Sequence, residues 1–283
     1  GVRHLLETQE KINIEPNIPL INALLYNAAK LHNAARAENF FKQLMDARLM
    51  PNIKTLDYFM QAHSQPDKFK VAVDIFSTYP AKFGLVPDAD MHASFIKILL
   101  NTGREDMALK RWDAMVEGKL PSPSNHGIQI MMEHFYAKGD FERVQSLFDS
   151  IKLRFGLYPD AHNFGTLLQM KIGQEKHDEA YSLIRELCAE HWAVSREAML
   201  ALMSAYQIAG DVAKVEALWD LLPAGKIPPD STFLTILVNV LCSAKNPDRA
   251  MAFMSLAQDK YGILFTRPMY VMLISQYGPT KQL

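Results

Sequence analysis

Apolar positions recur along this chain at intervals of 35 or 36 residues. A small residue fills one column of the pattern, a large residue follows four positions later, and another apolar position follows three positions after that. Offsets of four and seven place side chains on one face of an α-helix. The pattern therefore predicts one amphipathic helix per period. Its small residues are Ala37, Ala72, Ala108, Val144, Ala180, Val215 and Ala250, and its large residues are Phe41, Phe76, Trp112, Phe148, Ile184, Trp219 and Met254.

A second apolar column lies earlier in each period and predicts a second helix, about 12 residues long. It consists of Leu24, Phe59, Phe95, Met131, Leu167, Leu202 and Leu237, each followed by another bulky apolar residue. Glycines such as Gly103 and Gly139 mark where this first helix ends. Acidic residues such as Asp140 and Asp211 are suited to cap the start of the next helix.

Prolines separate one period from the next. Pro51, Pro87, Pro123 and Pro159 are each 36 residues apart, and Pro229 follows 70 residues after the last of them. Proline cannot continue a helix, so each predicted helix pair ends at this turn. The whole pattern predicts an all-α fold of stacked helix-turn-helix repeats of 35–36 residues, in which neighbouring pairs supply the core that one pair cannot form alone.

Seven repeats account for most of the chain. We place an N-terminal cap or partial helix at 1–17 and a partial C-terminal repeat or cap at 267–283. The large aromatic residues at core spacing are expected to pack inside rather than to stack on bases. The predicted repeats are 18–52, 53–88, 89–124, 125–160, 161–195, 196–230 and 231–266.

Composition narrows the class of protein. The 283 residues include 30 Lys and Arg and 31 Asp and Glu, a net charge of −1, so the chain lacks the excess positive charge of an indiscriminate nucleic-acid binder. Two cysteines cannot build a disulfide framework or a structural zinc site. Apolar runs are too short for a membrane span. The first residues show no signal or transit pattern, and the leading Gly1 suggests a processed or trimmed chain.

The repeat resembles the pentatricopeptide repeat. Tetratricopeptide repeats carry a small residue directly after the first-helix Leu, where this chain has Leu25, Met60 and other bulky residues. The spacing, the Pro-Asp ends such as Pro87-Asp88, and the segment ending at Asn52 are similar to pentatricopeptide units. The resemblance covers about 250 residues and implies a right-handed α-solenoid that binds single-stranded RNA, one base per repeat.

The resemblance also implies which residues would contact RNA. In that family the fifth residue of the first helix and the last residue of the repeat select the base. Asn22 with Asn52 resembles a pyrimidine-favouring pair, although Asn22 is equally suited to cap a neighbouring turn, and Lys30 is placed to face a phosphate. Ala93, Gly165 and Leu200 have no hydrogen-bonding side chain at this position. The candidate RNA-binding residues are Asn22, Asn52, Lys30, Asp57, Asp88, Gln129, Asp160, Thr235 and Thr266.

No catalytic motif is found, so we expect a protein that is not an enzyme and has no metal or other cofactor. The expected partners are single-stranded RNA or rRNA, with other proteins of a ribonucleoprotein as further partners. The leading interpretation is an organellar RNA-binding protein acting in RNA stability, processing or translation, in the mitochondrial matrix, with the chloroplast as the other location. The alternative is a structural or scaffold subunit of a large ribonucleoprotein such as the mitochondrial ribosome. The poor base-selecting pairs and the neutral charge favour this alternative.

Overall fold

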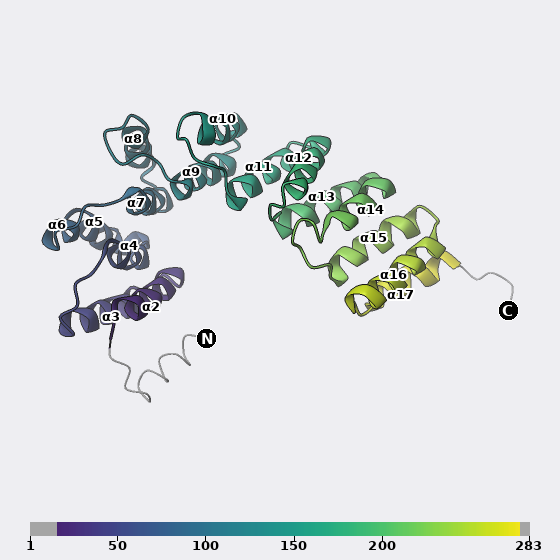
Figure 1. The fold of residues 1–283 in the computed structure, drawn as a ribbon, viewed down its shortest axis with the longest axis horizontal. Helices are drawn as coiled ribbons and strands as arrows, with labels where there is room; N and C mark the ends of the chain where they lie inside the picture. Colours follow the sequence, from purple (N-terminus) through teal and green to yellow (C-terminus); the bar gives the residue numbers. More distant parts are fainter. Residues whose placement is uncertain (1–15, 278–283) are drawn as a thin grey trace. The chain divides into compact units, whose positions relative to one another are not determined.

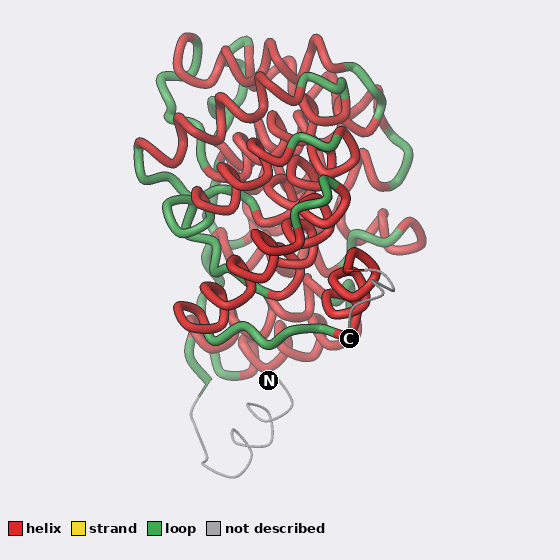
Figure 2. Tube along the Cα trace, turned by 90° about the vertical axis from the view of Figure 1, so that its right-hand side faces the viewer, coloured by secondary structure: helices red, strands yellow, loops and turns green. Residues whose placement is uncertain are grey.

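The structure is a computed structural model that describes residues 16–277 (Figure 1). It divides into two compact units, Gly1–Tyr158 and Pro159–Leu283, each built from helix pairs. Figure 2 shows helices joined by short loops, and residues 16–277 contain no strand. The prediction of an all-α helical-repeat fold is therefore confirmed. The predicted cap at 1–17 lies almost wholly outside the described residues.

In the first unit, each first helix packs against its own second helix and against the next first helix. The second helix predicted for residues 53–88 is divided into two short helices. The first follows a 3-10 turn, Pro66–Lys68, and the second contains Pro80. The helices are α2 (Ile18–Lys30), α3 (Ala34–Asp46), α4 (Ile53–Ala62), α5 (Phe69–Ser77), α6 (Tyr79–Lys82), α7 (Ala89–Asn101), α8 (Glu105–Val116), α9 (Asn125–Ala137) and α10 (Phe141–Leu153).

The second unit has the same internal order of contacts. Its helices are α11 (Ala161–Gly173), α12 (His177–Ala189), α13 (Arg196–Ala209), α14 (Val212–Leu221), α15 (Ser231–Ser243), α16 (Pro247–Tyr261) and α17 (Arg267–Tyr277). None of the helices in residues 16–277 is both long and apolar enough to cross a membrane. The grouping of these helices into the seven predicted repeats remains our proposal.

A polar cap fixes where each first helix begins. The side-chain oxygen of the capping residue accepts a hydrogen bond from a backbone N–H in the first turn, which would otherwise have no partner. Asn52 and Asp160 form complete capping boxes with Thr55 and Asn163. The caps of the seven first helices before α17 are Asn17, Asn52, Asp88, Ser124, Asp160, Ser195 and Asp230.

Glycines and aspartates set the turn inside a helix pair. Gly103, Gly139 and Gly210 have φ angles of 74°, 74° and 72°, in the left-handed region that glycine adopts without steric cost. Asp140 and Asp211 then cap α10 and α14, as the sequence predicted. In each of these pairs, the second helix therefore begins three or four residues after the last residue of the first helix.

The periodic apolar columns form the core. All seven residues of the small column are fully buried, so the paired helices approach closely at those points. Most large residues that follow are also buried, including Trp112 and Trp219, while Phe76 is only half-buried and stacks on Phe95 at 4.4 Å between ring centroids. Burial of each such side chain stabilises the fold by about 1.5–3 kcal/mol.

Candidate nucleic-acid interface

A polar groove runs over the first helices of the first unit. It has a volume of about 540 Å³ and is lined by side chains from α2, α4, α7 and α9. Three of its lining residues are lysines, Lys30, Lys54 and Lys97, and three are aspartates, Asp57, Asp88 and Asp90. The groove thus offers both cations and hydrogen-bond acceptors on one face. Two sequence candidates at the fifth and last positions, Asp57 and Asp88, are brought together here.

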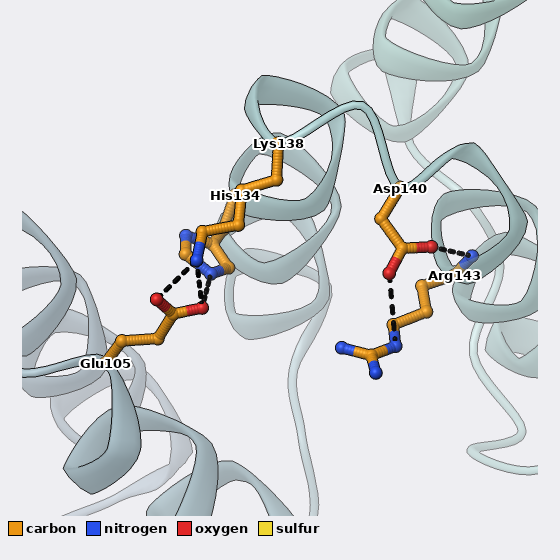
Figure 3. Close-up of polar contacts among 5 residues, drawn as sticks. All are labelled: Glu105, His134, Lys138, Asp140 and Arg143. Carbon is orange, nitrogen blue, oxygen red and sulfur yellow. Dashed lines mark hydrogen bonds and ion pairs between the residues drawn. The ribbon is translucent and has the colours of Figure 1, made fainter.

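The groove lysines differ from basic residues at the ends of other first helices. All three are exposed, and none forms an ion pair with any residue in 16–277. Lys30 lies 5.4 Å from the ring centroid of Tyr26. By contrast, Figure 3 shows Lys138 at the end of α9 against Glu105, which also accepts from His134 at 3.1 Å. The Lys138 ammonium holds the pKa of the Glu105 carboxyl below its usual range.

Similar ion pairs neutralise basic residues of the second helices. Arg143 contacts Asp140 at 3.3 Å, as Figure 3 also shows, and Arg249 contacts Glu216 at 2.7 Å. Lys214 pairs with Asp178, an acidic residue in the first turn of α12. Unlike these cations, the lysines of α2, α4 and α7 line the groove without an ion pair to any residue in 16–277.

Asp57 is the most perturbed acid in the groove. Its Oδ2 accepts from Gln61 Nε2 at 3.0 Å, whereas its buried Oδ1 has no hydrogen-bond partner. Burial raises the pKa of the Asp57 carboxyl to about 7, and the nearby charges of Asp88 and Asp90 add to the shift while the Gln61 hydrogen bond opposes it. Around neutral pH this carboxyl is therefore divided between its charged and neutral forms.

Asn22 and Asn52 form a hydrogen-bonded pair across two helices. Asn52 Oδ1 accepts from the Thr55 backbone N–H at 2.9 Å, from the Thr55 hydroxyl at 2.9 Å and from Asn22 Nδ2 at 3.3 Å. Asn22 Oδ1 in turn accepts from the Thr55 hydroxyl at 2.7 Å. Both amide oxygens are thus used internally. The exposed Nδ2 group of Asn52, which donates to no residue in 16–277, remains as an outward donor.

This arrangement settles which residue caps the turn. The sequence left Asn22 open to either capping or base contact. In the structure Asn52 is the cap of α4, and Asn22 contacts that cap from α2. A pair of amide donors is complementary to carbonyl oxygens such as those on pyrimidine bases.

Comparison with known proteins agrees with this architecture. No protein-family model matches the chain. The mitochondrial 15S rRNA processing factor CCM1 of Yarrowia lipolytica is 21% identical over 80% of the chain and 30% of its own length. A mitochondrial pentatricopeptide repeat-containing protein of Arabidopsis thaliana is 23% identical over 79% of the chain and 38% of its own length. The chain thus spans about a third of each of these curated relatives.

A solved structure has the same fold. The pentatricopeptide repeat protein PPR10 in complex with an 18-nucleotide psaJ RNA element superimposes with a TM-score of 0.52 and 16% identity, over 97% of the chain and 39% of that protein. The chain is thus similar to pentatricopeptide repeat proteins in its sequence and in its helical fold.

The other candidate residues are not gathered at one site. Gln129 is nearly buried and donates to Glu133 at 2.8 Å, while Asp160 caps α11. The Thr235 hydroxyl donates to the Ser231 carbonyl within its own helix at 2.6 Å. Thr266 precedes α17, and its buried hydroxyl has no hydrogen-bond partner. Their contact with RNA remains a prediction.

Sequence reasoning missed much of the groove lining. Lys54, Asp90 and His126 line the groove and are 36 residues apart, as the second residues of consecutive repeats. Tyr26, Gln61 and Lys97 form a similar column at the ninth position. The signal was present, because these positions share a helix face with the fifth position. These positions belong neither to the apolar columns nor to the two positions that select the base in pentatricopeptide repeats.

Proposed function

We propose that this pentatricopeptide repeat protein binds single-stranded RNA along the groove of its first unit. The observation that carries the proposal is the cluster of three lysines without an ion-pair partner and two tyrosine rings that line the groove. Lysines neutralise phosphates, and the Tyr26 and Tyr58 rings, 5.3 Å apart, offer surfaces on which bases stack. The Asp57 carboxyl group lines the groove with them and adds a hydrogen-bond acceptor.

The relatives support a mitochondrial role. One is named as a processing factor for mitochondrial 15S rRNA, and the other is named as mitochondrial. We therefore propose that the chain acts in the mitochondrial matrix on single-stranded RNA or rRNA, in RNA stability, processing or translation. We assign it no catalytic step of its own. Binding alone can protect RNA from degradation or expose a neighbouring segment.

A salt series with matched charge variants tests the proposal. Binding of labelled single-stranded RNA is measured by fluorescence anisotropy at several salt concentrations. Replacing Lys30, Lys54 and Lys97 with Gln is expected to weaken binding and to lower the salt slope by about two, since each phosphate contact with a single strand contributes about 0.7. The control replaces Lys42, Lys70 and Lys110, exposed lysines on second helices of the same repeats.

Two results would count against the proposal. One is the absence of RNA retention by the unchanged chain even at low salt, which would favour the scaffold interpretation. The other is an equal loss of binding in both triple variants, which would show that the groove has no special role. Circular dichroism of each variant verifies that the helices remain folded.

Base preference is tested at the amide pair. Asn22→Ala removes one amide donor and leaves the Asn52 cap in place, so it should weaken binding to pyrimidine-rich RNA more than to purine-rich RNA. Asn27→Ala is the control, because Asn27 lies on the same helix and donates to the Ala23 carbonyl instead. An equal loss on both RNAs would remove Asn22 from base recognition.

A further inference from the structure

The loops that follow the second helices of the first unit lie along one edge of that unit. Ser124, just before α9, donates to Asp90 in the first turn of α7 at 2.6 Å, so the starts of these two first helices are neighbours. Arg154, just after α10, donates to the carbonyl of Val116 at the end of α8 at 3.4 Å, so the ends of these second helices are neighbours too. We define the loop edge as these loops with the last two residues of the helix before each: 45–52, 81–88, 115–124 and 152–158.

The loop edge carries most of the strongly exposed apolar side chains of this unit. In residues 16–158, five large apolar side chains are more than 60% exposed, and only Leu31 among them lies elsewhere. Single exposed apolar residues are normal on a protein surface, whereas several that gather on one edge indicate an interaction site. The four on the loop edge are Met50 at 61%, Val86 at 82%, Leu153 at 87% and Tyr158 at 72%.

The backbone exposes these side chains in the same way in three of the loops. Arg48, Gly84 and Gly156 have φ angles of 55°, 66° and 64°, in the left-handed region. The next residue in each loop is a half-buried leucine, and the residue after that is the exposed Met50, Val86 or Tyr158. The core of the unit is therefore served by the leucine, and the apolar side chain that follows it is available to a partner.

Basic residues accompany the exposed apolar residues. Of the three acidic residues on the loop edge, Asp88 caps α7 and Glu117 pairs with Lys119 at 2.6 Å, which leaves Asp46. Apart from Lys119, the basic residues of the loop edge form no ion pair with any residue in 16–277. All five basic residues are exposed: Arg48, Lys82, Lys119, Lys152 and Arg154.

We propose that the loop edge of the first unit docks on a membrane surface that contains anionic lipids. Apolar side chains at such a surface enter the boundary between headgroups and acyl chains, and tyrosine favours the headgroup level. Lysine and arginine attract anionic headgroups while their aliphatic stems lie along the apolar layer. Separate apolar side chains on neighbouring loops suit a fluid lipid surface, because it needs no complementary shape, better than they suit a folded protein partner.

Co-sedimentation of the full chain with lipid vesicles tests this docking. Vesicles of phosphatidylcholine alone are compared with vesicles of equal parts phosphatidylcholine and phosphatidylserine. We expect the chain to bind mainly to the anionic vesicles, and less tightly as the salt concentration rises. Replacing Arg48, Lys82 and Lys152 with Gln should weaken this binding by about tenfold or more, because each basic residue near an anionic surface changes the affinity about fivefold.

The apolar contribution is tested by a second triple variant. Met50→Ser, Val86→Ser and Leu153→Ser together should also weaken binding to the anionic vesicles by about tenfold or more, because these side chains no longer enter the lipid boundary. The matched controls are made off the loop edge at exposed positions, where we expect little change in binding. They are Met107→Ser, Val71→Ser and Leu31→Ser for the apolar variant, and Arg36→Gln, Lys42→Gln and Lys70→Gln for the basic variant.

A fluorescent label provides a measurement on an otherwise unchanged surface. Both native cysteines are buried, so a thiol-reactive, environment-sensitive dye attaches to an introduced cysteine. On Val86→Cys its emission should shift to shorter wavelength when anionic vesicles are added, because the dye enters the lipid. On Met107→Cys the emission should stay the same. Equal shifts at both positions would overturn the proposal.

The RNA groove and the loop edge can be tested separately. No exposed apolar or basic residue of the loop edge lines the groove. The groove variant of Lys30, Lys54 and Lys97 should therefore keep its vesicle binding, and both loop-edge variants should keep their RNA binding. The proposal would be overturned if the unchanged chain did not bind anionic vesicles at low salt, or if loop-edge and control variants lost vesicle binding equally. Loss of RNA binding with unchanged vesicle binding in the loop-edge variants would also overturn it, by assigning the edge to RNA.

Discussion

Replacing Asp57 with Asn should make the stability of the first unit less dependent on pH. Burial raises the pKa of this carboxyl from 3.8 to about 7 in the folded chain. The folded state therefore holds the proton more tightly than the unfolded state, so stability is full below pH 3.8 and falls as the pH rises toward 7. A tenfold change in proton affinity is worth about 1.4 kcal/mol, so the whole rise in the pKa of Asp57 corresponds to about 4 kcal/mol.

The variant isolates this effect because an amide has nearly the shape of a carboxyl group but no charge to bury. The difference in unfolding free energy between Asp57→Asn and the original chain should widen by about 3 kcal/mol between about pH 5 and about pH 8, since roughly two of the titrating pH units lie in that interval. Working with this difference cancels the titration of other groups, including His92.

Urea unfolding followed by circular dichroism at both pH values measures the effect. The matched control is Asp113→Asn, which removes the same charge from an exposed position on α8. A difference that stays constant with pH would refute the assignment of a buried, high-pKa carboxyl at position 57. A pH-dependent difference that Asp113→Asn shares would assign the effect to net charge instead.

Other predictions concern acid stability, capping and turns. Burial and the nearby Arg111 lower the pKa of His92 from 6.5 to about 4, so the unfolding free energy falls as the pH drops from 6.5 through 4. His92→Gln should reduce this loss of unfolding free energy by up to about 3 kcal/mol, measured by urea unfolding. An unchanged pH profile would contradict the prediction. Ser195→Ala removes the cap of α13 and should lower the unfolding free energy by about 1 kcal/mol, whereas Ser182→Ala should change it by less than about 0.5 kcal/mol; equal losses would argue against capping. Gly139→Ala forces a side chain into a turn with φ of 74° and should cost about 1–2 kcal/mol; a neutral result in thermal unfolding would show that the turn relaxes.

Much of the fold could be predicted because the same local pattern of capping, turn and core residues recurs in successive repeats. The residue just before a first helix accepts a hydrogen bond from a backbone N–H of the first turn that has no other partner. Asp88, Ser124 and Asp230 do this within their own segment, so their role can be read from the sequence. The column of Ala37, Ala72 and its equivalents identified the close-packed face, since only small side chains fit where two helices meet. The division of the second helix in residues 53–88 was missed, because the proline at 80 competes with a helical pattern that otherwise continues.

The candidate site was only partly predictable. The sequence placed Asn22, Asn52, Asp57, Asp88 and Lys30 on the first-helix side, since their positions follow from the period. It could not show that Asn22 donates to the Asn52 cap, because that contact joins residues 30 positions apart. Nor could it show which lysines are unpaired, since pairs such as Lys138 with Glu105 join residues 33 positions apart.

The sequence by itself determined the helix pairs, their caps and turns, and the faces that pack, because each of these depends on residues within a few positions or on a repeated column. Tertiary structure alone decided the charge state of Asp57 and the exposure of Ile274. Both depend on what lies around a side chain: neighbouring helices remove water from Asp57, whereas Ile274 of α17 is 70% exposed. Identical repeat positions therefore acquire different properties once the helices are stacked.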